Sequence, residues 1–300
     1  MQELSDPDHL TASRLLPSTA GAAASIRIGT AAWSIPKEHA APFPVAGSHL
    51  ERYGAVLNAV EINSSFYRPH RRATYERWSD SVPEDFRFAV KVPKVITHER
   101  RLKDVGDLLD QFLSEAGGLG PKLGPLLVQL PPRLAFEPSI ADHFLSELRS
   151  RVEGGIVCEP RHASWFTPEV QSLLDELRIA RVAADPAPVP RADEPGGWRG
   201  LSYYRLHGSP RIYYSAYSPE YLAAMAEVLA RDAAAGLDTW CIFDNTAAFA
   251  ATGDALTTRD LVRDSAPSSS SARPGGSGIP SAEGELPKGG ILRSLDDMLK

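Results

Sequence analysis

The amino-acid sequence predicts a single-domain β/α barrel of the TIM type, with eight parallel strands. Short apolar runs alternate with amphipathic helical stretches. This alternation indicates parallel pairing, because each crossover between parallel strands needs the length that a helix supplies. Eight such units in about 240 residues match the usual size of this barrel. Polar or charged residues follow nearly every apolar run, which is typical of a site at the carboxyl ends of barrel strands.

The first four expected strands lie in the N-terminal half. Residues 26–30 and 86–91 alternate apolar and polar side chains, as half-buried strands do. Residues 59–62 and 125–130 are mostly apolar, which is typical of strands buried on both faces. Ser48 is a good N-cap for the first of the helices expected here, which are residues 48–57, 71–80 and 105–116.

The second half repeats the pattern with shorter strands. Pro168 is expected in the first turn of its helix, where a missing amide hydrogen costs nothing. The segment 187–200 is too rich in proline and glycine for a full helix. The expected strands are residues 156–158, 179–184, 201–206 and 239–243, and the expected helices are residues 139–149, 168–177, 219–235 and 246–262.

The two ends of the chain fall outside the expected barrel domain, residues 26–262. Residues 1–25 are rich in Ala, Ser, Thr and Asp without a sustained period, so a loose tail is expected. Within residues 263–300, a Ser/Pro/Gly-rich stretch predicts a disordered linker. Apolar residues at helical spacing from Ile291 to Leu299 predict a short helix after it.

Composition limits the classes of protein that fit. The formal net charge of -6 argues against a general nucleic-acid binder, which is usually basic. No apolar run approaches the roughly 20 residues that span a bilayer, and no signal-peptide pattern opens the chain, so we expect a cytoplasmic protein without membrane contact. Cys158 and Cys241 lie in expected strands and have no metal-ligand spacing, which favours buried free thiols.

The turn after the first strand argues against a dinucleotide site. Its sequence, GTAAW at residues 29–33, is not the G-x-G-x-x-G fingerprint of an open nucleotide-binding sheet. We therefore expect no nicotinamide or flavin cofactor.

Seven short motifs occur in order between about residue 26 and residue 262. They are GTAAW (29–33), VEINSSFYRP (60–69), KVPKVITH (91–98), GPLLVQLPP (124–132), EPRHASW (159–165), YRLHG (204–208) and FDNT (243–246). Together they resemble the YecE-like family, the domain-of-unknown-function family numbered 72. The resemblance implies a β/α barrel with a site at these motifs but no reaction, because the family has no established activity.

Three residues depart from the family pattern. Ala32 stands where the family tends to have a second glycine, and Phe249 and Asp254 stand where glycine and asparagine are expected. A phenylalanine at position 249 is expected to narrow the barrel mouth near the eighth loop.

The favoured mechanism is acid/base chemistry on a small anionic substrate, with some strand-end charges serving only as structural ion pairs. Carboxylates and imidazoles are the usual proton carriers, so the expected catalytic residues are Glu61, Glu159, His162 and His207. A Schiff base on Lys91 is a narrower variant, and an ion pair of Lys91 with Glu61 or Glu159 is favoured over it. Arginine suits phosphate or carboxylate, and the expected substrate-binding residues are Trp33, Asn63, Tyr67, Lys91, His98, Gln129, Arg161, Arg205 and Asn245. The 208–211 loop and a helix start at Asn245 and Thr246 are expected to hold phosphate.

Two alternatives stay open. A divalent metal bound by Glu159, Asp185, His207 and Asp244 would make the protein a hydrolase or isomerase of sugar phosphates or phosphodiesters. A non-catalytic role in binding a ligand or nucleic acid is suggested by basic residues interleaved with aromatic ones, although a solvated helix face explains the same pattern. The basic residues are Arg68, Arg71, Arg72, Arg77, Lys91, Lys94, Arg100, Arg101 and Lys103, and the aromatic ones are Phe66, Tyr67, Tyr75 and Trp78.

Overall fold

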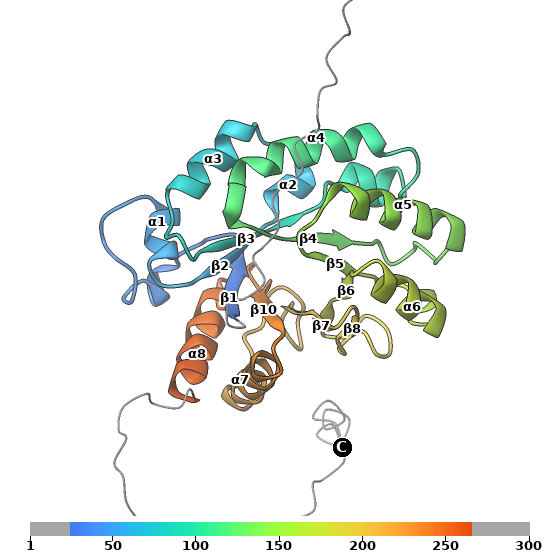
Figure 1. Ribbon diagram of the computed structural model, residues 1–300. Helices are drawn as coiled ribbons and strands as arrows, with labels where there is room; N and C mark the ends of the chain where they lie inside the picture. Colours follow the sequence, from blue (N-terminus) through green and yellow to red (C-terminus); the bar gives the residue numbers. More distant parts are fainter. Residues whose placement is uncertain (1–24, 266–300) are drawn as a thin grey trace, which may run out of the picture.

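A ring of parallel strands surrounded by helices forms the computed structural model, which describes residues 25–265 (Figure 1). The sheet order is β7-β9-β10-β1-β2-β3-β4-β5-β6-β8. Only Val182 separates β6, which pairs with β5, from β7, which pairs with β9. The two segments are therefore halves of one barrel strand that closes the ring, and the predicted eight-stranded β/α barrel is confirmed. The two-residue β8 pairs antiparallel with β6.

The strands fall close to their predicted positions. They are β1 (Ile26–Ala31), β2 (Ala59–Ile62), β3 (Arg87–Lys91), β4 (Leu123–Gln129), β5 (Ile156–Glu159), β6 (Ala180–Arg181), β7 (Ala183–Asp185), β8 (Gly196–Gly197), β9 (Leu201–Leu206) and β10 (Asp238–Phe243).

The helices pack outside the strands. They are α1 (His49–Gly54), α2 (Ser64–Tyr67), α3 (Arg72–Asp80), α4 (Gly106–Ala116), α5 (Pro138–Arg151), α6 (Pro168–Glu176), α7 (Pro219–Ala234) and α8 (Ala250–Ser265), with short helical turns η1 (Lys37–His39), η2 (Val95–Glu99), η3 (Gly117–Lys122) and η4 (Ala163–Trp165). Ser48 caps α1 in a capping box, and Pro168 opens α6, as predicted.

Two helical boundaries differ from the prediction. The last helix begins at Ala250 rather than at residue 246, because the buried Asn245 amide donates to the Ser215 carbonyl (2.9 Å) and to Asp254 (2.7 Å) instead of capping a helix. The short α2 was not predicted. Its Ser65 hydroxyl donates to the Ile62 and Lys91 carbonyls (3.0 and 2.7 Å), which holds the turn between β2 and β3.

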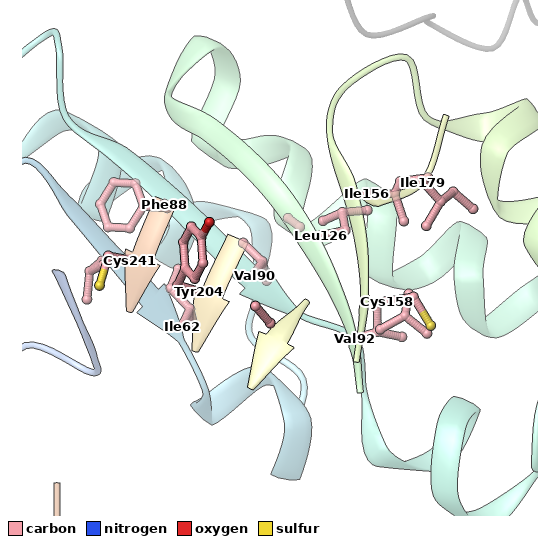
Figure 2. Packing of buried hydrophobic residues seen from close by; sticks show 14 of the residues in the cluster. Ile62, Phe88, Val90, Val92, Leu126, Ile156, Cys158, Ile179, Tyr204 and Cys241 are labelled. Carbon is pink, nitrogen blue, oxygen red and sulfur yellow. The ribbon is translucent and has the colours of Figure 1, made fainter. Parts of the chain in front are cut away.

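Strand alternation divides the core into two parts. Outward side chains pack under the helices, as Figure 2 shows for Ile62, Phe88, Val90, Tyr204 and Cys241. Inward side chains fill the barrel, namely Ala31, Ala59, Ala89, Leu127, Val157, Ala180, Val182, Leu201, Tyr203, Trp240 and Ile242. Because the period of a strand is two, the next inward position along six strands is polar: Glu61, Lys91, Gln129, Glu159, Arg205 and Asp244.

Three remaining predictions concern the thiols, the membrane and the tails. Cys158 and Cys241 are free and buried, as expected. Within residues 25–265, no helix combines the length and the apolar character needed to cross a bilayer. The predicted N-terminal tail, the linker and the helix from Ile291 to Leu299 lie outside the described residues, apart from the short stretch where α8 extends to Ser265.

Candidate functional site at the barrel mouth

Arg205 is the centre of a buried charged network at the carboxyl ends of the strands. Its guanidinium donates to Glu61 (2.8 Å) and Glu159 (3.1 Å) and lies 2.9 Å from Asp244. Arg205, Glu61 and Glu159 are at most 1% exposed. Burial alone would lower the pKa of Arg205, but Asp244, Glu61 and Glu159 raise it well above its usual value. Arg205 is therefore a permanent cation whose donors are already taken by protein carboxylates.

Glu159 accepts hydrogen bonds from three further side chains. The Gln129 amide donates to both carboxylate oxygens at 3.0 Å, and Arg161 Nε donates at 3.0 Å. His207 Nε2 lies 3.3 Å from Glu159 Oε1. Burial would raise the pKa of Glu159, but Arg205, His207 and Arg161 hold it well below its usual value. Glu159 is consequently a fixed anion at neutral pH.

His207 bridges two carboxylates through its two ring nitrogens. Nδ1 lies 3.0 Å from Asp244 Oδ2, opposite the contact with Glu159. Burial lowers the pKa of His207, but the hydrogen bonds with Asp244 and Glu159 outweigh it, and the net effect raises the pKa. Asp244 also accepts a long hydrogen bond from the Asn63 amide (3.4 Å). The His207–Asp244 pair can therefore hold and release a proton at the mouth.

Tyr203 completes the coordination of Glu61, and sequence reasoning missed it. Its hydroxyl donates to Glu61 Oε2 at 2.8 Å. Both oxygens of Glu61 are thus occupied by Tyr203 and Arg205 in a fully buried position. The available signal was the strand period, since Tyr203 precedes Arg205 by two residues and shares its face.

Lys91 is the exception in this network. It is 7% exposed, yet within residues 25–265 its amine makes no hydrogen bond and no ion pair; Nζ lies 4.2 Å from the centre of the Phe66 ring. Burial and the neighbouring Arg205 lower the pKa of Lys91 to about 8, despite the opposing effect of Glu61, Glu159 and Asp244. A buried amine with this pKa is partly neutral near physiological pH, and a neutral amine is a base and a nucleophile.

His98 lies on the other edge of the same aromatic ring. Its imidazole packs edge-on against Phe66 at 5.0 Å, and Nδ1 is 2.9 Å from the Thr97 hydroxyl. Burial and the charges of Lys91, Arg161 and Lys94 lower the pKa of His98 to about 4. The imidazole is therefore neutral at physiological pH. Phe66 contacts both Lys91 and His98 through its ring. From the sequence, Phe66 was expected only as a member of the aromatic and basic cluster.

The loop after β9 contributes a residue that the sequence did not single out. Tyr213 packs edge-on against His207 at 5.7 Å and raises the pKa of Arg161 together with Glu159, against the effect of burial. Its backbone has φ 70°, and its amide donates to the His207 carbonyl. The loop therefore places an aromatic side chain beside the two mouth residues His207 and Arg161. A run of aromatic residues after the YRLHG motif was the only signal for it.

Several predicted site residues lie apart from the network. Trp33 packs against Trp78 at 5.1 Å, and Tyr67 is 78% exposed. His162 accepts from the Ser164 amide as the cap of a short helical turn. Asp185 accepts from the Tyr217 hydroxyl at 2.9 Å. Asn245 is fully buried and begins no helix, so the predicted phosphate site at a helix start there is wrong.

The predicted metal ligands are only partly brought together. Glu159 and Asp244 both pair with Arg205 and both contact His207, while Asp185 is bound to Tyr217. Over the described range, no group of three or more His, Cys, Asp or Glu side chains is arranged to hold a metal ion.

The basic cluster does not present its aromatic residues to solvent as a group. Phe66 and Tyr75 are buried and Trp78 is partly buried, whereas Tyr67 is exposed. Lys91 points into the barrel, and its basic partners Arg68, Arg71, Arg72, Arg77, Lys94, Arg100, Arg101 and Lys103 are exposed. The basic side chains therefore form a solvated surface, and most of the aromatic side chains belong to the core.

The residues that depart from the family pattern occupy special backbone positions. Ala32 has φ 70° and Phe249 has φ 65°, in the left-handed region where glycine is preferred. Phe249 is 52% exposed, in the turn that precedes α8. It faces a surface cavity of about 420 Å³ lined by Ser34, Ile35, Pro36, Lys37, Glu38, His49 and Phe249.

Comparison with protein families gives one match over most of the chain. The family model described as "Protein of unknown function DUF72" matches residues 27–276. UPF0759 protein YecE of Escherichia coli K12 is 33% identical over 173 residues, 55% of this chain and 60% of that protein. UPF0759 protein YunF of Bacillus subtilis is 28% identical over 152 residues, 48% of this chain and 53% of that protein. The alignments thus span little more than half of these curated relatives.

Solved structures give the same fold. A DUF72 family protein from Enterococcus faecalis superposes with a TM-score of 0.68 at 22% identity, covering 80% of this chain and 96% of that one. A DUF72 family protein from Thermotoga maritima superposes with a TM-score of 0.64 at 23% identity, covering 79% and 99%. At these identities the likeness establishes the barrel and nothing about chemistry.

Proposed function

Since this chain belongs to the DUF72 family, whose description assigns no function, we propose from its own residues that it is an enzyme. It binds a small anionic substrate at the barrel mouth and acts on it by proton transfer. The observation that supports this proposal is Lys91, a buried amine without a carboxylate partner in the described part of the chain, beside a network in which every other buried charge is paired. Burying such a group is costly, and perturbed groups of this kind concentrate at functional sites.

The charge distribution supports an anionic ligand. Arg205 is saturated by Glu61, Glu159 and Asp244, so it orders the network rather than binding substrate. Lys91, Lys94 and Arg161 act together on His98, so an excess of positive charge surrounds that imidazole. An anion bound beside His98 would contact Arg161 and Lys94, whose donors are exposed or partly exposed. It would also contact the amine of Lys91. Arginine in particular suits phosphate and carboxylate.

Proton transfer is assigned to Lys91, whose pKa is lowered by burial and Arg205, and to His207, whose pKa is raised by its hydrogen bonds with Asp244 and Glu159. Lys91, with a pKa of about 8, accepts a proton as its neutral amine, and His207 releases one as imidazolium. Glu61 and Glu159, which sequence reasoning placed as the acid/base pair, instead hold Arg205 and His207 in position. A metal-dependent reaction has less support, because Asp185 lies with Tyr217 rather than with the other three expected ligands.

The binding half of the proposal is tested by thermal shift with sugar phosphates and small carboxylic acids. We expect at least one compound to stabilise the wild type and the control Lys103→Met, an exposed lysine. Removal of the Arg161 charge by Arg161→Met should lower the affinity of the protein for that compound by about tenfold or more, because one good contact contributes about this much to binding. Equal binding to Arg161→Met, or no stabilisation by any compound, would overturn the assignment.

The chemical half is tested by proton exchange. The stabilising compound is incubated with the protein in D₂O and followed by proton NMR. We expect loss of one C–H signal with the wild type and with Lys103→Met, and no loss with Lys91→Met. Exchange that persists in Lys91→Met would exclude Lys91 as the base.

A further inference from the structure

We infer that Lys91 is a nucleophile that forms an imine with its substrate, so that the substrate is a small aldehyde or ketone carrying an anionic group. This inference rests on the proposed function, because it names the substrate class of the same site. It begins from a contrast between two buried lysines of this chain.

Lys122 shows how a buried structural lysine is accommodated. It is 8% exposed, and its amine donates to the carbonyls of Ser79 (2.8 Å) and Val82 (2.9 Å) and lies 3.8 Å from Glu84. Its charge is therefore compensated, as buried charges normally are. Lys91 is equally buried but has only the face of the Phe66 ring in the described structure. A lysine whose role was structural would be expected to have partners like those of Lys122.

The surroundings of Lys91 favour a neutral amine. Glu61, Glu159 and Asp244 are turned toward Arg205, so their charge is largely compensated before it reaches Lys91. Besides the residual attraction of these carboxylates, the ammonium has the cation–π contact with Phe66. Burial and Arg205 bring the pKa of Lys91 to about 8, so roughly one amine in ten is neutral at pH 7. That fraction suffices for attack on a carbonyl carbon.

The reaction balances with groups that surround the amine. The nitrogen lone pair forms a C–N bond to the carbonyl carbon as the C=O π bond breaks, and one proton passes from that nitrogen to the oxygen, which becomes a hydroxyl. A second proton converts that hydroxyl to water as the C=N bond forms. The His207–Asp244 pair, whose Asp244 interacts with Lys91, supplies this proton. The resulting iminium withdraws electrons and so promotes loss of a proton from the adjacent carbon, with no oxidant or reductant needed.

The substrate anion is placed by the cations that act on His98, whose imidazole shares the Phe66 ring with Lys91. Arg161 is fixed by Glu159 (2.9 Å) at the end of β5, and Lys94, which follows β3, lies 3.3 Å from the exposed Glu99. An anionic group bound there brings a neighbouring carbonyl toward Lys91. In this form of the proposed function the Lys91 nitrogen is bound in the iminium and activates the substrate instead of acting as the base, and His98, which is neutral and shares the Phe66 ring, accepts the released proton. Chemistry of this kind needs a carbonyl and an anion on one small molecule.

Reductive trapping tests the inference on the intact protein. Wild type is incubated with pyruvate or dihydroxyacetone phosphate and sodium borohydride, and peptides are mapped by mass spectrometry. We expect one dominant adduct, on Lys91, whose mass equals the probe less one oxygen atom, with about tenfold or more lower labelling of the exposed Lys103. Labelling of Lys91 by glycolaldehyde, which carries no anion, should be unchanged by Arg161→Met, whereas labelling by the anionic probes should fall.

Variants separate the imine from the binding site. Lys91→Arg keeps the charge but lacks a primary amine, so it should be folded, bind the probe in thermal shift and give no adduct at position 91. Probe binding by the wild type without labelling of Lys91 would overturn the imine while the proposed function stands. Neither binding nor labelling by any anionic carbonyl would overturn both. Labelling of Lys91 that is insensitive to Arg161→Met would overturn the placement of the anion.

Discussion

Lys91 is held in the barrel at a cost to stability, because its charged form is disfavoured there. A lysine whose folded pKa is lowered from 10.5 to about 8 binds fewer protons folded than unfolded between these pH values. Stability therefore rises with pH across that window. We expect Lys91→Met to raise the free energy of unfolding at pH 7 by roughly 2–3 kcal/mol, and the gain to shrink toward pH 10.5.

Urea denaturation at pH 7 and pH 10 measures this effect. Lys122→Met is the matched control, because Lys122 is a buried amine that donates two hydrogen bonds. The Lys122→Met protein should be less stable than the wild type at pH 7, because those hydrogen bonds are lost. A Lys91→Met protein that is less stable than the wild type at pH 7, or whose gain does not depend on pH, contradicts the picture of an uncompensated amine.

His207 makes the opposite contribution to the pH dependence. Its folded pKa is raised above 6.5 by Asp244 and Glu159, so its stabilisation is complete below pH 6.5 and is lost as the pH rises through the folded pKa. We expect the stability difference between the wild type and His207→Gln to be largest near pH 6 and to shrink above it. Urea denaturation along a pH series measures the difference, and a difference that does not shrink as the pH rises would contradict the assignment.

At the scale of the elements, two turns carry strained residues. Ala32 after β1 and Phe249 before α8 have left-handed backbones, and the Ala32 amide donates to the Glu61 carbonyl at 2.9 Å. The left-handed conformation costs an L-residue about 1–2 kcal/mol, while glycine adopts it freely but loses more entropy on folding. This accounts for the expectation of glycine at both positions.

We expect Ala32→Gly and Phe249→Gly each to raise the free energy of unfolding by about 0.5–1 kcal/mol. The two turns lie near each other, because Phe249 and Ser34 line the same cavity and the Thr252 hydroxyl donates to the Ser34 carbonyl at 3.0 Å, so the double variant measures the coupling between the two gains. Ala40→Gly is the control, because φ is −75° at that position and glycine should destabilise it. Thermal unfolding distinguishes the cases, and a loss of stability at position 32 would argue against strain there.

At the scale of the whole molecule, Arg205 connects strands from separate parts of the barrel. It links β9 to Glu61 on β2, Glu159 on β5 and Asp244 after β10. Removing one partner of a buried ion pair leaves uncompensated charge, which costs about 3–5 kcal/mol. We therefore expect Arg205→Met to lose about that much, measured in urea. Arg191→Met, which removes an exposed pair with Glu194, should change stability by about 0.5 kcal/mol or less, and similar effects of the two substitutions would refute a central role for Arg205.

The fold followed from the sequence because its signals are local. Alternation of strands and helices predicted the barrel, and the strand period placed Glu61, Lys91, Glu159 and Arg205 at inward positions near the strand ends. Local patterns also placed the caps and the start of α6. They were wrong at Asn245, because its amide is engaged by Ser215 and Asp254 rather than by a following helical turn.

The sequence by itself therefore determined which elements form, their order and which charges enter the barrel. Only the tertiary structure decided which charges pair. Arg205 meets Glu61 across 144 positions of sequence and takes the carboxylates that would otherwise compensate Lys91, while His162 and Asp185 turn to Ser164 and Tyr217. The physical reason is that pairing depends on which strands face each other across the closed barrel and on competition between desolvated groups for the same partners. Neither is encoded in the spacing of residues along the chain.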